Sequence, residues 1–210
     1  MADTEDNQSN TADEYPPLKI SCTTTKCDEG LHCFLQKKKR RKRDMVEENP
    51  GGGGGKCRSC GADLVEWPRV HQRDLKDVAH TFQMIKYEFI RHHFWHVEID
   101  QKAVNHALRK GREGMRTAVE KRIRRSVSDA SPPYDGRQTP KSGNSIYYAQ
   151  HATATCCRKC IEEWHDVPRG VALTDEEVVY FTNLVMLYIK ERLPQLQDEG
   201  IKVPRISSGK

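Results

Sequence analysis

Apolar residues recur at intervals of three and four in three stretches of the chain, and these stretches predict three principal helices. The first stretch covers residues 70–93 and the second roughly residues 101–125. Asp100 is suited to cap the second helix, because its side chain can accept a hydrogen bond from the first helical amides. The expected buried faces consist of Val70, Leu75, Val78, Phe82, Ile85, Phe89 and Ile90 in the first stretch and of Val104, Ala107, Leu108, Met115, Ala118, Val119 and Ile123 in the second.

The third helix has the clearest boundaries. Thr174 and Glu177 have the spacing of a capping box, in which each side chain bonds to the backbone amide of the other residue. The apolar pattern continues to Leu193, and Pro194 ends the helix because it has no amide hydrogen to donate.

Shorter elements separate the second and third helices. Prolines and glycines make residues 128–143 a loop, while 146–148 is expected to be a short strand and 157–165 a short helix. The predicted fold class is mainly α, with three principal helices, a Cys/His turn region stapled by metal, and little β-structure.

The chain also divides by composition. Residues 1–17 are an acidic tail that we expect to be disordered, residues 18–35 are Cys-rich, and residues 36–56 form a basic and glycine-rich linker. Residues 57–194 are expected to form the helical metal-binding domain, followed by a tail over 195–210.

Two Cys-x-x-Cys steps carry the strongest chemical signal. One joins Cys57 to Cys60 and is followed by Gly61, and the other joins Cys157 to Cys160. This spacing lets two thiolates from one tight turn bind one tetrahedral ion, and a glycine supplies the positive φ that such a turn needs. We therefore expect one or two zinc ions per chain, with an iron–sulfur cluster as the nearest alternative.

These ligands can be grouped in two ways. Both Cys pairs could build one Cys₄ site, or each pair could belong to a separate site. In the two-site grouping, the first pair is completed by two residues from Cys22, Cys27, His32 and Cys33, and the second pair by His165 with either His151 or Cys156. The eight cysteines could instead form disulfides, but short spacings beside histidines favour metal ligands in a reducing compartment.

Histidines also cluster in residues 91–96. His92 and His96 are four residues apart and would share a helix face, as metal-binding pairs do, although the dipole at a helix C-terminus also favours histidines. The candidate catalytic residues of an open zinc site are His151, His96 and Gln150.

Positive charge is concentrated in two places, although the net charge is only +5. One place is a run of seven consecutive basic residues: Lys37, Lys38, Lys39, Arg40, Arg41, Lys42 and Arg43. Without this run, the chain has 28 basic and 30 acidic side chains, so the remainder is nearly neutral. In the predicted second helix, Arg109, Arg116 and Arg124 lie at intervals of seven and eight. Such clusters bind phosphate, so we expect contact with nucleic acid; a solvated linker and a solvated helix face are the alternatives.

One long motif carries a resemblance to a known family. It consists of Gln138-Thr139-Pro140, then Gln150-His151-Ala152-Thr153-Ala154-Thr155-Cys156-Cys157-Arg158, then Trp164-His165 and Thr174 to Glu177. The motif resembles a small bacterial family known only as a domain of unknown function. The resemblance covers roughly residues 90–190, with Phe94 and His96 matching a Phe-then-His step.

The resemblance implies no activity, but it bears on the grouping of ligands. Members tend to be about half as long as this chain, and Cys57 and Cys60 are additions here. The resemblance therefore implies that the site around residues 151–165 is self-sufficient, which favours two sites.

Together these features predict a cytoplasmic zinc-binding protein that contacts nucleic acid through basic surfaces. The sequence has no secretory signal, and no apolar run approaches the ~18 residues that span a bilayer, so no membrane partner is expected. One alternative is a metal-dependent hydrolase with an open zinc site near His151. The other is a protein-interaction module, whose protein partners the sequence does not indicate.

Overall fold

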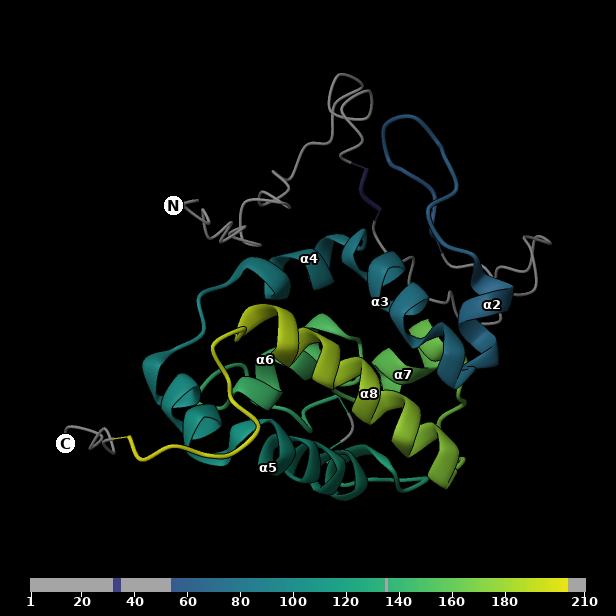
Figure 1. The fold of residues 1–210 in the computed structure, drawn as a ribbon. Helices are drawn as coiled ribbons and strands as arrows, with labels where there is room; N and C mark the ends of the chain where they lie inside the picture. Colours follow the sequence, from purple (N-terminus) through teal and green to yellow (C-terminus); the bar gives the residue numbers. More distant parts are fainter. Residues whose placement is uncertain (1–31, 35–53, 135, 204–210) are drawn as a thin grey trace, which may run out of the picture.

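The computed structural model describes residues 32–34, 54–134 and 136–203, and in these ranges the protein is built of helices joined by loops (Figure 1). The described residues contain no β-sheet, only isolated bridges that pair Phe34 with Glu88 and Lys56 with Asp63. The predicted class, mainly α with little β-structure, is confirmed. The elements are α2 (Trp67–Gln72), the 3₁₀ helix η1 (Leu75–Asp77), α3 (Val78–Lys86), α4 (Phe89–His96), α5 (Gln101–Val127), α6 (Ser145–Ala152), α7 (Arg158–His165) and α8 (Asp175–Arg192).

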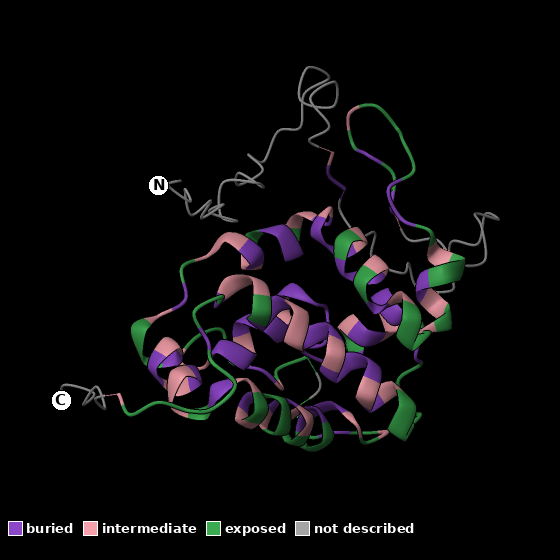
Figure 2. Cartoon of the chain, in the orientation of Figure 1, coloured by how far each residue is buried: buried purple, intermediate pink, exposed green. Residues whose placement is uncertain are grey.

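Helix α8 lies at the centre of the packing. It crosses in front of α6 and α7 in Figure 1 and contacts α3, α5 and α6. The predicted capping box is confirmed, since the Glu177 amide donates to Thr174 Oγ1 at 3.1 Å and the Thr174 amide donates to Glu177 Oε2 at 3.0 Å. Buried positions run along the helix where it meets its neighbours (Figure 2). They include Val178, Tyr180, Phe181, Leu184, Val185, Tyr188 and Ile189.

The single helix predicted over residues 70–93 is wrong, because this stretch forms α2, η1, α3 and the start of α4. Arg73 adopts left-handed φ of 53° after α2, and the Asp74 side chain then caps η1 by accepting from the Lys76 amide at 2.9 Å. Before α4, Glu88 is extended, with φ of −76° and ψ of 125°. Phe34 pairs with the backbone on both sides of Glu88, so a contact distant in sequence overrides the helical pattern there.

The second predicted helix is confirmed as α5, and Asp100 caps it by accepting from the Ala103 amide at 2.8 Å. Gly111 interrupts this helix with φ of 64° and ψ of 178°. Residues 196–201 pack against the interruption, where the Arg112 amide donates to Gln197 O at 2.8 Å. The interval between Arg109 and Arg116 spans the break, so their sequence spacing does not put them on one regular helix face.

The short strand expected at residues 146–148 is also wrong, because these residues lie in α6. Asn144 caps that helix by accepting from the Ile146 amide at 3.0 Å. The cap and the burial of Ile146, Tyr148 and Ala149 outweigh the β-propensity of the isoleucine and tyrosines. The short helix expected from residue 157 to 165 is confirmed as α7. No helix in the described part of the chain has the length and apolar character needed to cross a membrane.

Candidate metal centres

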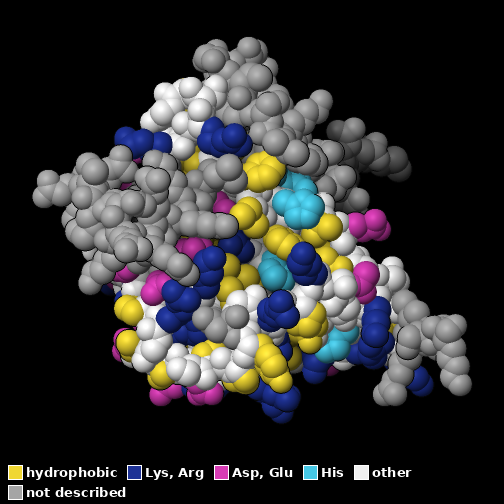
Figure 3. Space-filling model, turned by 180° about the vertical axis from the view of Figure 1, so that it is seen from behind, with side chains coloured by type: hydrophobic (Ala, Val, Ile, Leu, Met, Phe, Trp, Pro, Cys, Tyr) yellow, Lys and Arg dark blue, Asp and Glu magenta, His cyan; other side chains and the backbone are white. Residues whose placement is uncertain are grey.

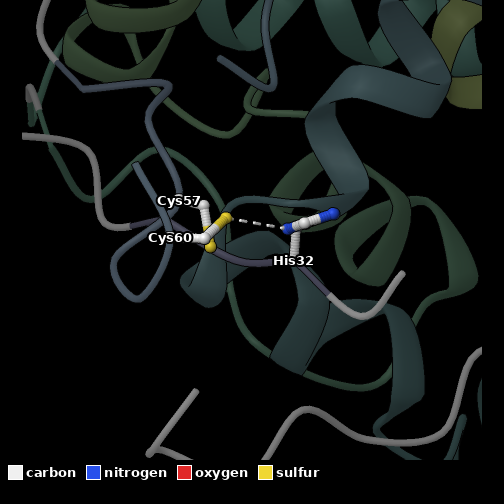
Figure 4. A group of neighbouring side chains, drawn as sticks. All are labelled: His32, Cys57 and Cys60. Carbon is white, nitrogen blue, oxygen red and sulfur yellow. Dashed lines mark hydrogen bonds between the residues drawn. The ribbon is translucent and has the colours of Figure 1, made fainter. Parts of the chain in front are cut away.

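His32, Cys57 and Cys60 form the first candidate centre (Figure 4). Their ligand atoms all lie within 4.8 Å of one another, and Cys60 Sγ is 3.5 Å from His32 Nδ1. Both cysteines come from one loop, whereas His32 comes from a separate segment, and the three side chains point toward one another (Figure 4).

A tight turn holds the two cysteines of the first centre together. The Cys57 amide donates to Ala62 O at 2.8 Å, and the Gly61 amide donates to Cys57 O at 3.0 Å. Gly61 has φ of 77°, which is the left-handed conformation expected of a glycine after Cys-x-x-Cys. The Arg58 amide donates to Cys33 O at 3.0 Å and so ties the turn to the segment that carries His32.

The first turn also favours a thiolate at Cys57. Burial alone would raise the pKa of Cys57, but hydrogen bonds from the Cys60, Cys33 and Ser59 amides and from His32 lower it to about 5. Amide hydrogen bonds to sulfur stabilise the charged form, and the charged form is the metal ligand.

Cys156, Cys157 and Cys160 form the second candidate centre. Their sulfur atoms all lie within 4.8 Å of one another, and no disulfide links them. Cys157 is the N-cap residue of α7, so Cys160 lies in the first turn of the helix. Cys156 and Cys157 are each 6% exposed, and Cys160 is half-buried.

The polar residues that precede these cysteines in the sequence shape the turn. Gln150 is fully buried; its Oε1 accepts from Arg122 Nε at 3.2 Å and from Thr139 Oγ1 at 3.2 Å, and its Nε2 donates to Thr155 O at 3.0 Å. Ala154, with φ of 54°, reverses the chain between α6 and the cysteines. The geometry therefore gives Gln150 a structural part in holding the turn.

Arg158 fixes the other side of the same turn. It is 1% exposed, and its guanidinium donates to Val127 O at 3.1 Å and to Pro168 O and Val171 O at 2.7 Å each. The second centre is thus anchored to the end of α5 and to the loop that follows α7.

A buried ion pair lies directly beside the second centre. Arg91 Nη2 donates to Cys160 Sγ at 3.3 Å, and Arg91 Nε donates to Glu88 Oε2 at 2.8 Å. Hydrogen bonds from the Cys156 and Cys157 thiols, together with the Arg91 guanidinium, hold the pKa of Cys160 well below its usual range. Hydrogen bonds with Cys157 and with Cys160, together with burial, raise the pKa of Cys156. Sequence reasoning missed both Glu88 and Arg91; their spacing of three residues was the available signal.

The histidines predicted for the second centre lie outside the group of three sulfur atoms. His165 is fully buried, donates from Nε2 to Thr153 O at 3.2 Å, and contacts the Phe181 ring at 4.9 Å between centroids. His151 donates from Nε2 to Pro140 O at 3.1 Å and stacks on Phe94 at 4.5 Å.

The histidines of α4 lie close together, but among the described residues none of them belongs to a group of three potential metal ligands. The rings of His92 and His96 lie 4.0 Å apart, so they share a helix face as predicted. His96 donates from Nδ1 to His92 O at 2.9 Å. The structure places Cys33 next to His32 with 1% of its surface exposed, but its thiol is outside both groups. Cys22 and Cys27 lie outside the described residues.

The predicted nucleic-acid residues are only partly in view, because Lys37 to Arg43 lie outside the described residues. Arg116 Nη2 donates to Asn183 Oδ1 at 2.8 Å. Arg124 forms ion pairs with Glu120 at 3.0 Å and with Asp175 at 2.8 Å, so its charge is offset.

The fold and these two groups define an α-helical protein with two candidate metal centres. The chain belongs to a family described as a domain of unknown function, DUF4186, which matches residues 79–190. The resemblance drawn from the sequence motif is thereby confirmed. The matched range contains the second centre and its Glu88–Arg91 pair, and it leaves the first centre outside. No solved structure matches the chain.

The buried His165 predicts a pH-dependent stability. Burial lowers its pKa from about 6.5 to about 3, so in this range the unfolded chain binds a proton that the folded protein does not. The contribution of His165 to the free energy of unfolding is therefore fully present above pH 6.5. It falls by up to ~1.4 kcal/mol per pH unit as the pH drops toward 3. We expect His165→Phe to remove roughly 2 kcal/mol of the difference in unfolding free energy between pH 7 and pH 5.

Denaturant unfolding at the two pH values measures this effect. Comparing each variant with wild type at the same pH isolates His165, because the other titrating groups are the same in both proteins. Substitution of the exposed His93 by glutamine is the matched control and should leave the pH dependence as it is. An unchanged pH dependence in His165→Phe would contradict the assignment.

Proposed function

We propose that the protein binds two zinc ions, one at each centre. The supporting observation is that two separate groups each bring three thiol or imidazole ligand atoms within 4.8 Å of one another. Cysteine and histidine are the ligands of zinc sites, and tetrahedral Zn–S bonds of about 2.3 Å put neighbouring sulfur atoms about 3.8 Å apart. Each group needs only a small contraction to reach that spacing.

The first centre has a structural role in this proposal. It links residues 32–34 to the Cys57–Cys60 turn, which are separated in sequence by the glycine-rich stretch. Binding energy at a site that joins such segments adds directly to folding energy. Cys22 or Cys27 remains the predicted fourth ligand.

Elemental analysis of reduced, purified protein tests the proposal. We expect two zinc ions per chain, and one after either Cys60→Ser or Cys157→Ser. Ser59→Ala, which changes a residue between the two thiols of the first turn, is the matched control and should keep both ions. Metal-free wild type with inert thiols would refute zinc binding, and a brown protein would reveal an iron–sulfur cluster instead.

A catalytic zinc site is the second candidate function, and the second centre favours it. This group offers three protein ligands, and the half-buried Cys160 leaves one side of it accessible. Three protein ligands plus water is the coordination of catalytic zinc, whereas four protein ligands are typical of structural zinc. X-ray absorption of the Cys60→Ser protein distinguishes them: an oxygen neighbour beside three sulfurs supports a hydrolase, and a fourth sulfur or nitrogen contradicts it.

We also propose that the protein contacts nucleic acid, with Lys121 and Arg125 among the contacting residues. Both are exposed and line a surface hollow on α5 with Arg124, and neither forms an ion pair within the described ranges. On the face shown in Figure 3, Lys and Arg side chains stand in several groups among apolar and histidine side chains.

The binding test uses salt. Because basic side chains release counterions from phosphate, affinity for DNA or RNA should fall steeply between 50 and 200 mM salt. Deleting residues 37–43 should weaken binding to every sequence and flatten that slope, and the pair Lys121→Ala/Arg125→Ala should weaken it further. Absence of binding at low salt would contradict this proposal.

A further inference from the structure

Arg91 occupies the interface between the second centre and the core. It is 6% exposed, and its guanidinium donates to Cys160 Sγ at 3.3 Å and to His151 O at 2.7 Å. Cys156 Sγ lies 4.0 Å from Nη1 of the same guanidinium. One cation therefore faces two of the three sulfur atoms of the centre.

A metal ion bound by three thiolates would leave an excess negative charge, which this cation can compensate. Three thiolates around a divalent ion carry one net negative charge, and Cys156 and Cys157 are both 6% exposed. A charge held away from water is costly unless an opposite charge or hydrogen bonds compensate it. The Arg91 guanidinium supplies both, through its contacts with Cys160 Sγ and Cys156 Sγ.

Glu88 fixes Arg91 from the opposite side. Glu88 is fully buried, and its Oε2 accepts from Arg91 Nε at 2.8 Å and from Trp164 Nε1 at 3.1 Å. The backbone around Glu88 is held as well, because the Phe34 amide donates to Tyr87 O at 3.0 Å and the Phe89 amide donates to Phe34 O at 2.8 Å. These contacts fix the position of the guanidinium beside the second centre.

We infer that Arg91 is a positioning residue of the second centre, which holds the Cys160 thiolate toward the metal ion and offsets the excess negative charge of a three-thiolate site. Glu88 orients Arg91 for this purpose. The inference rests on the proposed zinc binding at the second centre. Hydrogen-bonding partners of metal ligands typically change metal affinity 10- to 100-fold when they are removed.

The test measures zinc affinity by competition with a chromophoric chelator in full-length Cys60→Ser protein, where the second centre holds the remaining zinc. Arg91→Met should weaken zinc binding roughly 10- to 100-fold. Because this change leaves Glu88 buried without its cation, the double variant Glu88→Gln/Arg91→Met is measured beside it and should show the same loss while keeping the fold. Arg91→Lys, which retains the charge, should recover part of the affinity. Arg69→Met removes an exposed guanidinium paired with Asp77 and is the control, with affinity expected to be unchanged.

A spectroscopic readout separates positioning from general destabilisation. Cobalt(II) bound at the second centre should show its sulfur-to-cobalt absorption in the Cys60→Ser background, and this band should shift or weaken in the Arg91→Met double variant. Cys60→Ser protein that binds neither zinc nor cobalt would refute the proposed second centre itself. A folded double variant that matches Cys60→Ser in both zinc affinity and cobalt spectrum would overturn the role of Arg91 and leave the zinc site standing.

Discussion

Cys160→Ser is expected to release one zinc ion per chain and to lower the melting temperature by roughly 10 °C. Serine is a poor zinc ligand, so the second centre would retain two of its three sulfur atoms. The loss also removes the sulfur that Arg91 contacts at 3.3 Å, leaving a buried guanidinium with one fewer partner. A combined loss of about 3–4 kcal/mol corresponds to this shift, since 1 kcal/mol moves the midpoint by about 2–4 °C in a protein of this size.

Zinc content and thermal unfolding, measured on the same samples, test this expectation. Cys33→Ser is the matched control, because Cys33 is also a buried cysteine but lies outside both groups of ligands. It should retain two zinc ions per chain. If Cys160→Ser keeps both its zinc and its melting temperature, Cys160 is not a ligand.

The sequence placed the cysteines of each Cys-x-x-Cys step close together because their geometry is local. Two thiols separated by two residues in one turn must lie close together, whatever the rest of the chain does. His165 was predicted as a ligand from its spacing to Cys160, but its side chain lies outside the group of three sulfur atoms. The geometry of the α-helix explains this position. Cys160 and His165 both belong to α7, and five residues at about 100° each place them on opposite sides of that helix. His165 therefore points into the core against Phe181.

Contacts between distant segments were the part that the sequence could not supply. The apolar pattern over residues 70–93 is helical throughout, yet pairing of Phe34 with the backbone around Glu88 separates α3 from α4. The same pairing orients Glu88 and, through it, Arg91 beside cysteines that lie more than sixty residues further along the chain. Neither the break nor the guanidinium at the second centre has a local signature apart from the three-residue spacing of the ion pair.

Several residues of the motif quoted from the sequence shape the second centre. Gln150 and Arg158 flank the three cysteines, and both side chains form hydrogen bonds with backbone carbonyls that hold the turn in place. His151 packs on Phe94, so the structure brings these two residues of the motif together. Within the matched range, the cysteines and the Arg91 contact are therefore the features best suited to chemistry.

The break in α5 leads to the second large expected effect: Gly111→Ala should destabilise the protein by roughly 3 kcal/mol or more. Gly111 has φ of 64° and ψ of 178°, a region of backbone conformation that is essentially restricted to glycine. A methyl group there would also overlap the backbone of Asp198 and Glu199. The strain and the overlap each cost about 1–3 kcal/mol, and backbone atoms cannot move aside as a flexible side chain can.

Relief of the overlap would displace residues 196–201 from α5. That displacement breaks the hydrogen bonds from the Arg112 amide to Gln197 O at 2.8 Å and from the Ile201 amide to Leu108 O at 2.9 Å. Denaturant unfolding gives the loss of stability, and limited proteolysis should show faster cleavage in this segment.

Gly114→Ala is the matched control in the same helix, where the nearest atom to the new methyl group is the Lys110 Cβ at 3.2 Å. Because alanine favours helix over glycine by roughly 0.5–1 kcal/mol, Gly114→Ala should change stability little or raise it slightly. Equal stability of the two variants would show that residues 196–201 do not pack into the break at Gly111 in solution.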